Sequence, residues 1–96
     1  MAANAFGRCR RCRRVRQFVC TERFRVNASK KVIDVWLLFR CWRCGALVKV
    51  PVLERVHVSR IARADLEAYR DNDSGMASRV QHDVALLSKV GLFVSA

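Results

Sequence analysis

The segment FVCTERFRVNASKKVIDVWLLFRCWRC, residues 18–44, contains two runs of strand-forming residues joined by a short polar stretch. In residues 18–26 apolar side chains alternate with polar ones, except at Glu22, which is the period of a half-buried strand. Residues 32–40 are rich in β-branched and aromatic side chains on both faces, as in a central strand. The polar residues 27–31 favour a turn. We therefore predict a β-hairpin whose two open ends lie together.

Each open end of this hairpin carries a CxxC pair. Cys9 and Cys12 precede the first strand, and Cys41 and Cys44 follow the second. A hairpin would bring the two pairs to one place, where four thiolates form a tetrahedral Zn²⁺ site. The 28 residues between Cys12 and Cys41 exceed the roughly 15–20 of the commonest zinc pattern, and the long hairpin accounts for the excess. We predict a structural zinc ion without chemistry of its own, because four thiolates leave no open position.

Two other uses of the cysteines are weaker. A redox CxxC is expected beside a βαβ unit, which the sequence does not predict, and an iron–sulfur cluster is a further alternative. The fifth cysteine, Cys20, lies on the predicted inner face of the first strand with Phe18 and Phe24, so we expect a buried thiol that packs as a small hydrophobe.

After the hairpin the sequence predicts one more strand. Residues 46–53 are mostly apolar, and Pro51 cannot donate a hydrogen bond to a neighbouring strand. The strand should therefore end at Pro51 or lie at the edge of the sheet.

The pattern then changes to the period of helices. Residues 59–70 predict a first helix with Ser59 as candidate N-cap, and residues 75–90 predict a second helix that stops at Gly91. Asp73 or Ser74 is the candidate cap of the second helix. The predicted fold class is α+β: a small zinc-ribbon-like three-stranded antiparallel sheet followed by two short helices. Residues 1–56 would form the basic β subdomain, and residues 57–96 a two-helix segment packed on it in one compact unit.

The positive charge is concentrated in the first part of the chain. The net charge is +11, and residues 1–60 hold 15 Lys and Arg against 3 Asp and Glu, whereas residues 61–96 hold 4 against 5. Clustered basic charge is the electrostatic footprint of nucleic-acid binders. We predict a nucleic-acid-binding module that makes mainly phosphate contacts and slightly prefers RNA over DNA. The candidate binding residues are Arg8, Arg10, Arg11, Arg13, Arg14, Arg16, Lys30, Lys31, Arg40, Trp42 and Arg43.

Two of these assignments have structural alternatives. Some arginines are needed to offset the −2 charge of a zinc–thiolate centre, although two or three would suffice and eight surround the cysteines. Trp42 can stack on a base, or it can cover the metal site.

Catalysis has little support in the sequence. His57 and His82 have no evident nucleophile or metal partner, and no phosphate-binding glycine motif is present. Arg79 and Asp83 have the spacing of an ion pair on the second helix, either exposed or buried with a specific role.

No apolar run reaches the length of a membrane span, and the first residues lack a secretory signal, so we expect a cytoplasmic protein with reduced thiols.

A set of blocks along the chain carries a family resemblance: Cys9/Cys12, Cys20 with Phe24–Ala28, Asp34–Leu37, Arg40–Cys44, Leu53–Arg55 and Asn72–Asp73, together with Arg79 and Asp83. These blocks resemble those of a bacterial family of uncharacterised proteins, the domain of unknown function 1062. The resemblance implies a bacterial, cytoplasmic, zinc-ribbon-like domain, and it implies no activity. The first CxxC of the family resembles CPxCG, and here it is arginine-rich.

A second hypothesis belongs to another functional class. The sheet could be a scaffold, and the helices with the apolar tail GLFVSA, residues 91–96, could form a docking surface for a protein partner or a homodimer.

Overall fold

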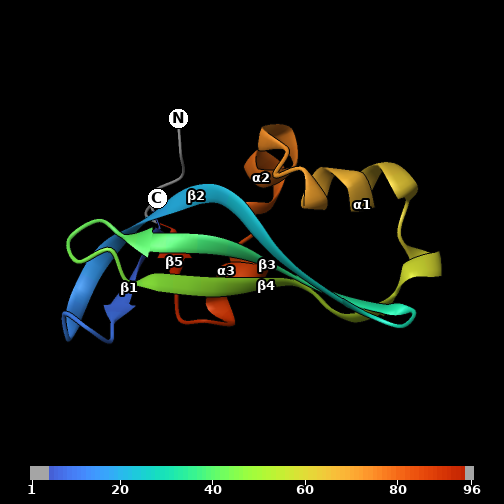
Figure 1. The fold of residues 1–96 in the computed structure, drawn as a ribbon. Coiled ribbons are helices and arrows are strands. Elements are labelled where there is room, and N and C mark those ends of the chain that lie inside the picture. Colours follow the sequence, from blue (N-terminus) through green and yellow to red (C-terminus); the bar gives the residue numbers. More distant parts are fainter. Residues whose placement is uncertain (1–4, 95–96) are drawn as a thin grey trace.

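The computed structural model describes residues 5–94, which form one antiparallel sheet and three helices (Figure 1). The strand order in the sheet is β4-β3-β2-β1-β5, and the sheet curls along the 16 residues of β2. The strands are β1 (Ala5–Cys9), β2 (Arg14–Ser29), β3 (Val32–Cys41), β4 (Leu47–His57) and β5 (Phe93–Val94). A 3-10 turn (Val58–Arg60) leads to the helices α1 (Arg63–Arg70), α2 (Ser74–Val80) and α3 (Val84–Ser88).

The predicted α+β class and the central hairpin are confirmed, but the predicted number of elements is wrong. Five strands replace three, because β1 and β5 join the sheet at the edge of β2 away from β3. β4 lies at the other edge, which agrees with the position of Pro51 within it.

The helical segment also differs from its prediction. The predicted second helix is two helices, because the Asp83 carboxylate accepts a hydrogen bond from the Leu86 amide and starts α3. Asp73 caps α2 as predicted, accepting from the Met76 amide at 2.9 Å. Ser59 lies in the 3-10 turn instead of capping α1, which begins at Arg63.

A bulge in β2 explains why Glu22 breaks the alternation of its strand. Cys20 pairs with Phe39 and Phe24 pairs with Leu37, so β2 holds two residues more than β3 over this interval. An even number of extra residues keeps Cys20 and Phe24 on the same face of the sheet. Glu22 lies at the centre of the bulge with φ of 59° and is exposed.

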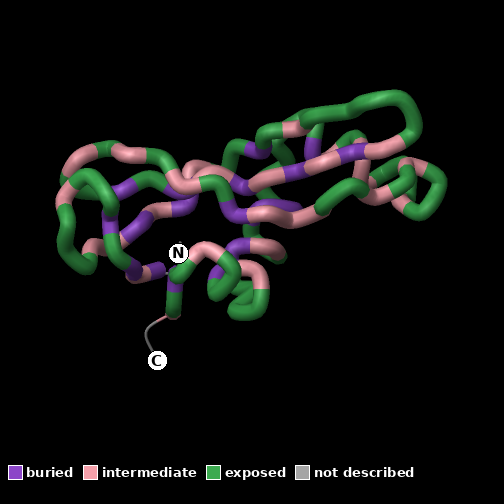
Figure 2. Tube along the Cα trace, turned by 90° about the horizontal axis from the view of Figure 1, so that it is seen from below, coloured by how far each residue is buried: buried purple, intermediate pink, exposed green. Residues whose placement is uncertain are grey.

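One face of the sheet and the helices share a single core. Buried and less buried residues alternate along β3 (Figure 2), and the buried ones pack with Tyr69, Met76 and Leu87 of the three helices. α1 and α2 contact β2, whereas α3 contacts β4 and β5. Cys20 is buried in this core, as predicted. Across residues 5–94, the helices are too short and too polar to cross a bilayer.

Candidate metal centre and basic end

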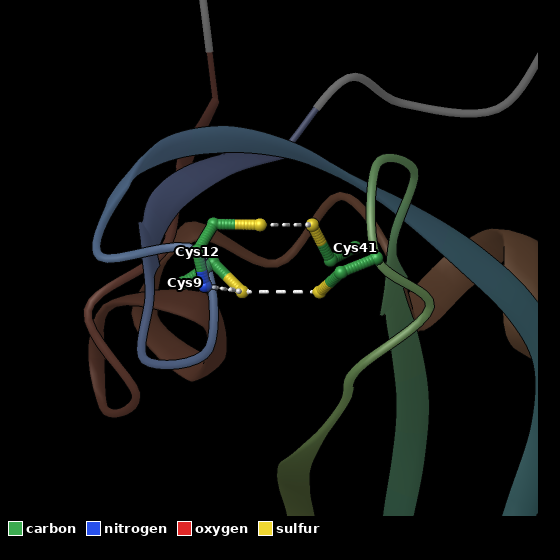
Figure 3. A group of neighbouring side chains, drawn as sticks. Cys9, Cys12 and Cys41 are labelled. Atoms are coloured by element: carbon green, nitrogen blue, oxygen red, sulfur yellow. Dashed lines mark hydrogen bonds between the residues drawn. The ribbon is translucent and has the colours of Figure 1, made fainter.

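The four predicted ligands come from two facing loops (Figure 3). Cys9 ends β1 and Cys12 lies in the following loop, whereas Cys41 ends β3 and Cys44 lies in the loop before β4. β2 holds these loops together, because its Phe18 pairs with Ala5 of β1 on one side and with Cys41 on the other. The hairpin therefore brings both CxxC pairs to one end of the sheet.

The sulfur positions fit one tetrahedral ion. The Cys9 and Cys44 sulfurs are 3.6 Å apart, those of Cys12 and Cys41 are 3.9 Å apart, and all four lie within 4.8 Å of one another. Four thiolates at the 2.3 Å zinc–sulfur distance would be separated by about 3.8 Å. Both of these separations are far too long for a disulfide, and all four thiols are free. The cluster is therefore a candidate metal centre.

Both loops have the same backbone turn. The Arg13 amide donates to the Cys9 carbonyl at 2.7 Å, and the Gly45 amide donates to the Cys41 carbonyl at 2.8 Å. The residue after each CxxC has positive φ, 79° at Gly45 and 59° at Arg13. Gly45 adopts this conformation freely, whereas Arg13 adopts it at a cost of about 1–2 kcal/mol.

The environment of the thiols differs within the cluster. A hydrogen bond from the Cys12 amide lowers the pKa of Cys9 to about 7. Burial opposes ionisation of Cys41, but the Cys44 and Arg43 amides outweigh it and lower its pKa. The Ala46 amide favours the Cys44 thiolate, yet burial and the three neighbouring thiols raise the Cys44 pKa to about 11. One thiolate forms readily here and the last forms poorly, so four thiolates need a cation among them.

Most of the predicted basic residues surround this cluster. Exposed arginines project from the two loops and from the strand ends next to them, and Arg16 is only half-buried. The ion pairs within residues 5–94 are Arg63–Glu67, Arg79–Asp65 and Lys89–Glu54, and none of them involves these arginines. We call this set the basic end: Arg8, Arg10, Arg11, Arg13, Arg14, Arg16, Arg40 and Arg43.

The structure separates two predicted residues from the basic end. Lys30 and Lys31 form the turn between β2 and β3, at the opposite end of a molecule that extends 40 Å (Figure 1). Trp42 lies in the second cysteine loop and is 60% exposed, so most of its surface faces solvent and does not cover the metal site.

The structure corrects one predicted side-chain pair and shows one contact that was not predicted. Arg79 and Asp83 do not pair with each other: Arg79 lies 3.7 Å from Asp65 of α1, and Asp83 caps α3. The His57 ring has a partner that the sequence did not indicate, because its Nδ1 lies 2.7 Å from the Ser59 hydroxyl and accepts from the Ser59 amide. This contact caps the 3-10 turn.

Sequence reasoning also missed two contacts between distant segments. The Asn72 side chain accepts a hydrogen bond of 2.7 Å from the Phe24 amide, directly after the β2 bulge. The Asp34 carboxylate accepts one of 2.8 Å from the Arg55 amide, at a register shift between β3 and β4. All four residues lie in blocks that carry the family resemblance, and this resemblance was the only feature of the sequence that pointed to them.

Comparison with known families gives one match. The family described as "Protein of unknown function (DUF1062)" matches residues 26–96, which is more than half of the chain, so the chain belongs to this family. The matched range includes Cys41 and Cys44 but begins after Cys9 and Cys12. No curated protein and no solved structure matches the chain.

Proposed function

We propose that this chain is a zinc-stabilised nucleic-acid-binding module. Cys9, Cys12, Cys41 and Cys44 would hold one Zn²⁺ as a structural ion, and the arginines of the basic end would contact phosphates. RNA is the preferred ligand and DNA the second. We expect binding without catalysis, in the cytoplasm, where thiols remain reduced.

Zinc is supported by the donor set and by the geometry of the cysteines. Four thiolates in tetrahedral arrangement select Zn²⁺ or an iron–sulfur centre. Sulfurs within 4.8 Å of one another suit a single ion. With four protein ligands the ion has no open position, so its contribution is to hold the loops together.

The observation that carries the nucleic-acid proposal is the exposed, carboxylate-free charge of the basic end. Seven of its eight arginines are exposed, and none forms an ion pair within the described residues. Two or three cations would offset the −2 charge of the metal centre. The surplus guanidinium groups can grip phosphate oxygens in pairs.

The test is a fluorescence-anisotropy titration of zinc-loaded protein with single-stranded RNA, duplex RNA and duplex DNA at three salt concentrations. The variant Arg10→Ala/Arg11→Ala/Arg14→Ala removes three cations from the basic end. The control Arg60→Ala/Arg63→Ala/Arg70→Ala removes three exposed cations from the helical side, so both variants have the same net charge.

We expect tight binding that weakens steeply with salt, with log K falling by about 0.7–0.9 per phosphate contact for each unit of log salt concentration. The basic-end variant should reduce this slope by about 3, and the control should leave it nearly unchanged. Equal losses in both variants would show that net charge alone drives binding. No binding at low salt would contradict the proposal.

The alternative of a protein adaptor or homodimer has less support. The tail contributes to the fold of its own chain, because Leu92 is buried and Phe93 stacks on Phe6 with ring centroids 6.1 Å apart. Light scattering at high protein concentration would detect a homodimer.

A further inference from the structure

We infer that a groove beside the metal centre binds one nucleotide of a single-stranded nucleic acid, with the phosphate on its basic rim and the base on its apolar wall. This inference rests on the proposed function and gives it a defined site. The groove has a volume of about 480 Å³, within the usual range of ligand pockets.

Three segments that are distant in sequence enclose this groove. The end of β1 and its loop contribute Arg8 and Arg10, the start of β4 contributes Leu47, Val48 and Lys49, and the residues after α3 contribute Val90. Cys9 also lines the groove, so the metal centre fixes the position of its β1 side.

The rim of the groove is complementary to a phosphate. Arg8, Arg10 and Lys49 are exposed and form no ion pair within residues 5–94. Lys89 also lines the groove, but Glu54 lies 3.3 Å from its ammonium group and partly neutralises it. The Lys49 ammonium also lies over the Trp36 ring, 5.2 Å from its centroid, so Arg8 and Arg10 are the main candidates for phosphate contact. Cations without a carboxylate partner around one concave site attract a phosphodiester more strongly than a flat surface with the same charge would.

The wall of the groove is complementary to a base. Leu47 is 59% exposed and lines the groove together with the half-buried Val48 and Val90. A base can reach this surface only when it is unpaired, because the bases of a duplex are stacked inside the helix. Single strands present such bases, and proteins usually recognise them in unstacked form.

The experiment maps three probes on zinc-loaded protein by two-dimensional amide NMR, which suits a chain of 11.0 kDa. The probes are an octamer of uridine, adenosine 5′-monophosphate and inorganic phosphate. The groove variant Arg8→Ala/Lys49→Ala is compared with Arg63→Ala/Arg70→Ala, which removes the same charge elsewhere. Leu47→Ser tests the apolar wall, and its amide spectrum reports whether the fold is intact.

We expect the octamer to shift the amides of residues 8–10 and 47–49 most strongly. The groove variant should weaken octamer binding about 10–100-fold, the control less than 3-fold, and Leu47→Ser should weaken octamer but not phosphate binding. The loss expected for the groove variant comes from two missing phosphate contacts, since such contacts supply most of the affinity of these complexes.

The outcomes separate this inference from the proposed function. If the octamer binds but its shifts are confined to residues 11–14 and 43, the groove is not the site and the proposed function stands. If the mononucleotide shifts the groove and no oligonucleotide binds, the groove is a nucleotide site and the proposed function is wrong. If none of the probes binds, both are wrong.

Discussion

The β2–β3 hairpin is held by different means at its open end and at its bulged middle. At the open end, four cysteines from two loops meet, and their sulfurs need a cation to be fully ionised. At the bulge, the Asn72 side chain accepts a hydrogen bond from Phe24 and Tyr69 packs edge-on against the Phe24 ring at 5.2 Å. The open end thus has the donor set of a metal site, whereas the middle is held by contacts within the chain itself.

This difference shows how a small domain can place a charged surface at one end. A bulge leaves backbone amides without ladder partners, and a buried unpaired amide is costly, so side chains from other segments must satisfy it. Asn72 does this at the β2 bulge, and Asp34 accepts from the Arg55 amide at the register shift between β3 and β4. The hydrogen bond from Asn72 thus holds the bulge, whereas at the open end four cysteines are positioned to bind a metal ion among eight arginines.

Removal of the metal should have the largest effect and should be confined to the open end. Zinc at about a thousand times its dissociation constant stabilises the folded state by about 4 kcal/mol. We expect chelation, or Cys41→Ser/Cys44→Ser, to remove this stabilisation and to speed hydrogen exchange of the Arg13 and Gly45 amides. The Phe24 amide should remain protected, because its partner Asn72 is unaffected.

Hydrogen exchange followed by mass spectrometry with and without chelator measures this difference. Cys20→Ser is the control for loss of a thiol outside the cluster, and it should leave metal stoichiometry unchanged. A uniform loss of protection across all strands would show that the two regions are one cooperative unit.

Gly7→Ala should have the next largest effect, and it tests how much packing alone holds β1. A Cβ at Gly7 would lie 2.6 Å from the Leu92 Cδ2 and 2.8 Å from the Gly91 carbonyl oxygen, so backbone must move. We expect a loss of about 2–3 kcal/mol of unfolding free energy, as for other overpacked cores. Denaturant unfolding measures it.

The control for this substitution is Gly75→Ala, because that Cβ would meet only a side-chain oxygen, of Asp73 at 3.1 Å. We expect Gly75→Ala to change the free energy of unfolding by no more than about 1 kcal/mol. An equally small change for Gly7→Ala would mean that metal binding, and not packing, determines the position of β1.

Asn72→Gly should have a smaller effect, located at the middle of the hairpin. Glycine tolerates the φ of 54° at this position but removes the acceptor of the Phe24 amide. Leaving this amide unpaired should cost about 1–3 kcal/mol. Asn72→Asp keeps an acceptor oxygen and should retain most of the stability. Zinc affinity should be unchanged in both variants, and a tenfold loss would show that the two regions are coupled.

The sequence predicts the hairpin and the cysteine cluster because both follow from local patterns. Alternation and β-branched residues define the two strands, and the CxxC pairs flank them. β1 and β5 could not be predicted in this way. The five residues of β1 include Gly7, Arg8 and Cys9, which do not have strand-like composition, and the two residues of β5 are too few to show a period.

The rest of the site depends on distances that sequence patterns do not contain. Lys30 and Lys31 look like part of one basic cluster in the sequence, but a strand of 16 residues places them far from the cysteines. Asn72 joins Phe24 across 48 residues, and no local period indicates this contact. The family resemblance pointed to these positions without indicating their role.

The pH dependence of zinc affinity should show the smallest effect, and it tests whether the cluster is organised before the metal binds. We call the cluster closed when its four sulfurs lie together as in this structure. In the closed cluster the Cys9 pKa is lowered to about 7 from its ordinary value of 9.0. Stabilisation of the closed form by this thiolate is therefore present above pH 9 and is lost as the pH falls through about 7. Between these values a closed metal-free cluster has already released the Cys9 proton.

Zinc binding in this window should then release no more than about three protons, because the ligands must all be deprotonated in the complex. A disordered set of four ordinary thiols would release about four. The slope of log affinity against pH, from competition with a chromophoric chelator at pH 7.5, 7.75 and 8.0, counts these protons. A slope near four would mean that the open end folds only when the metal binds, whereas the middle of the hairpin folds without a ligand.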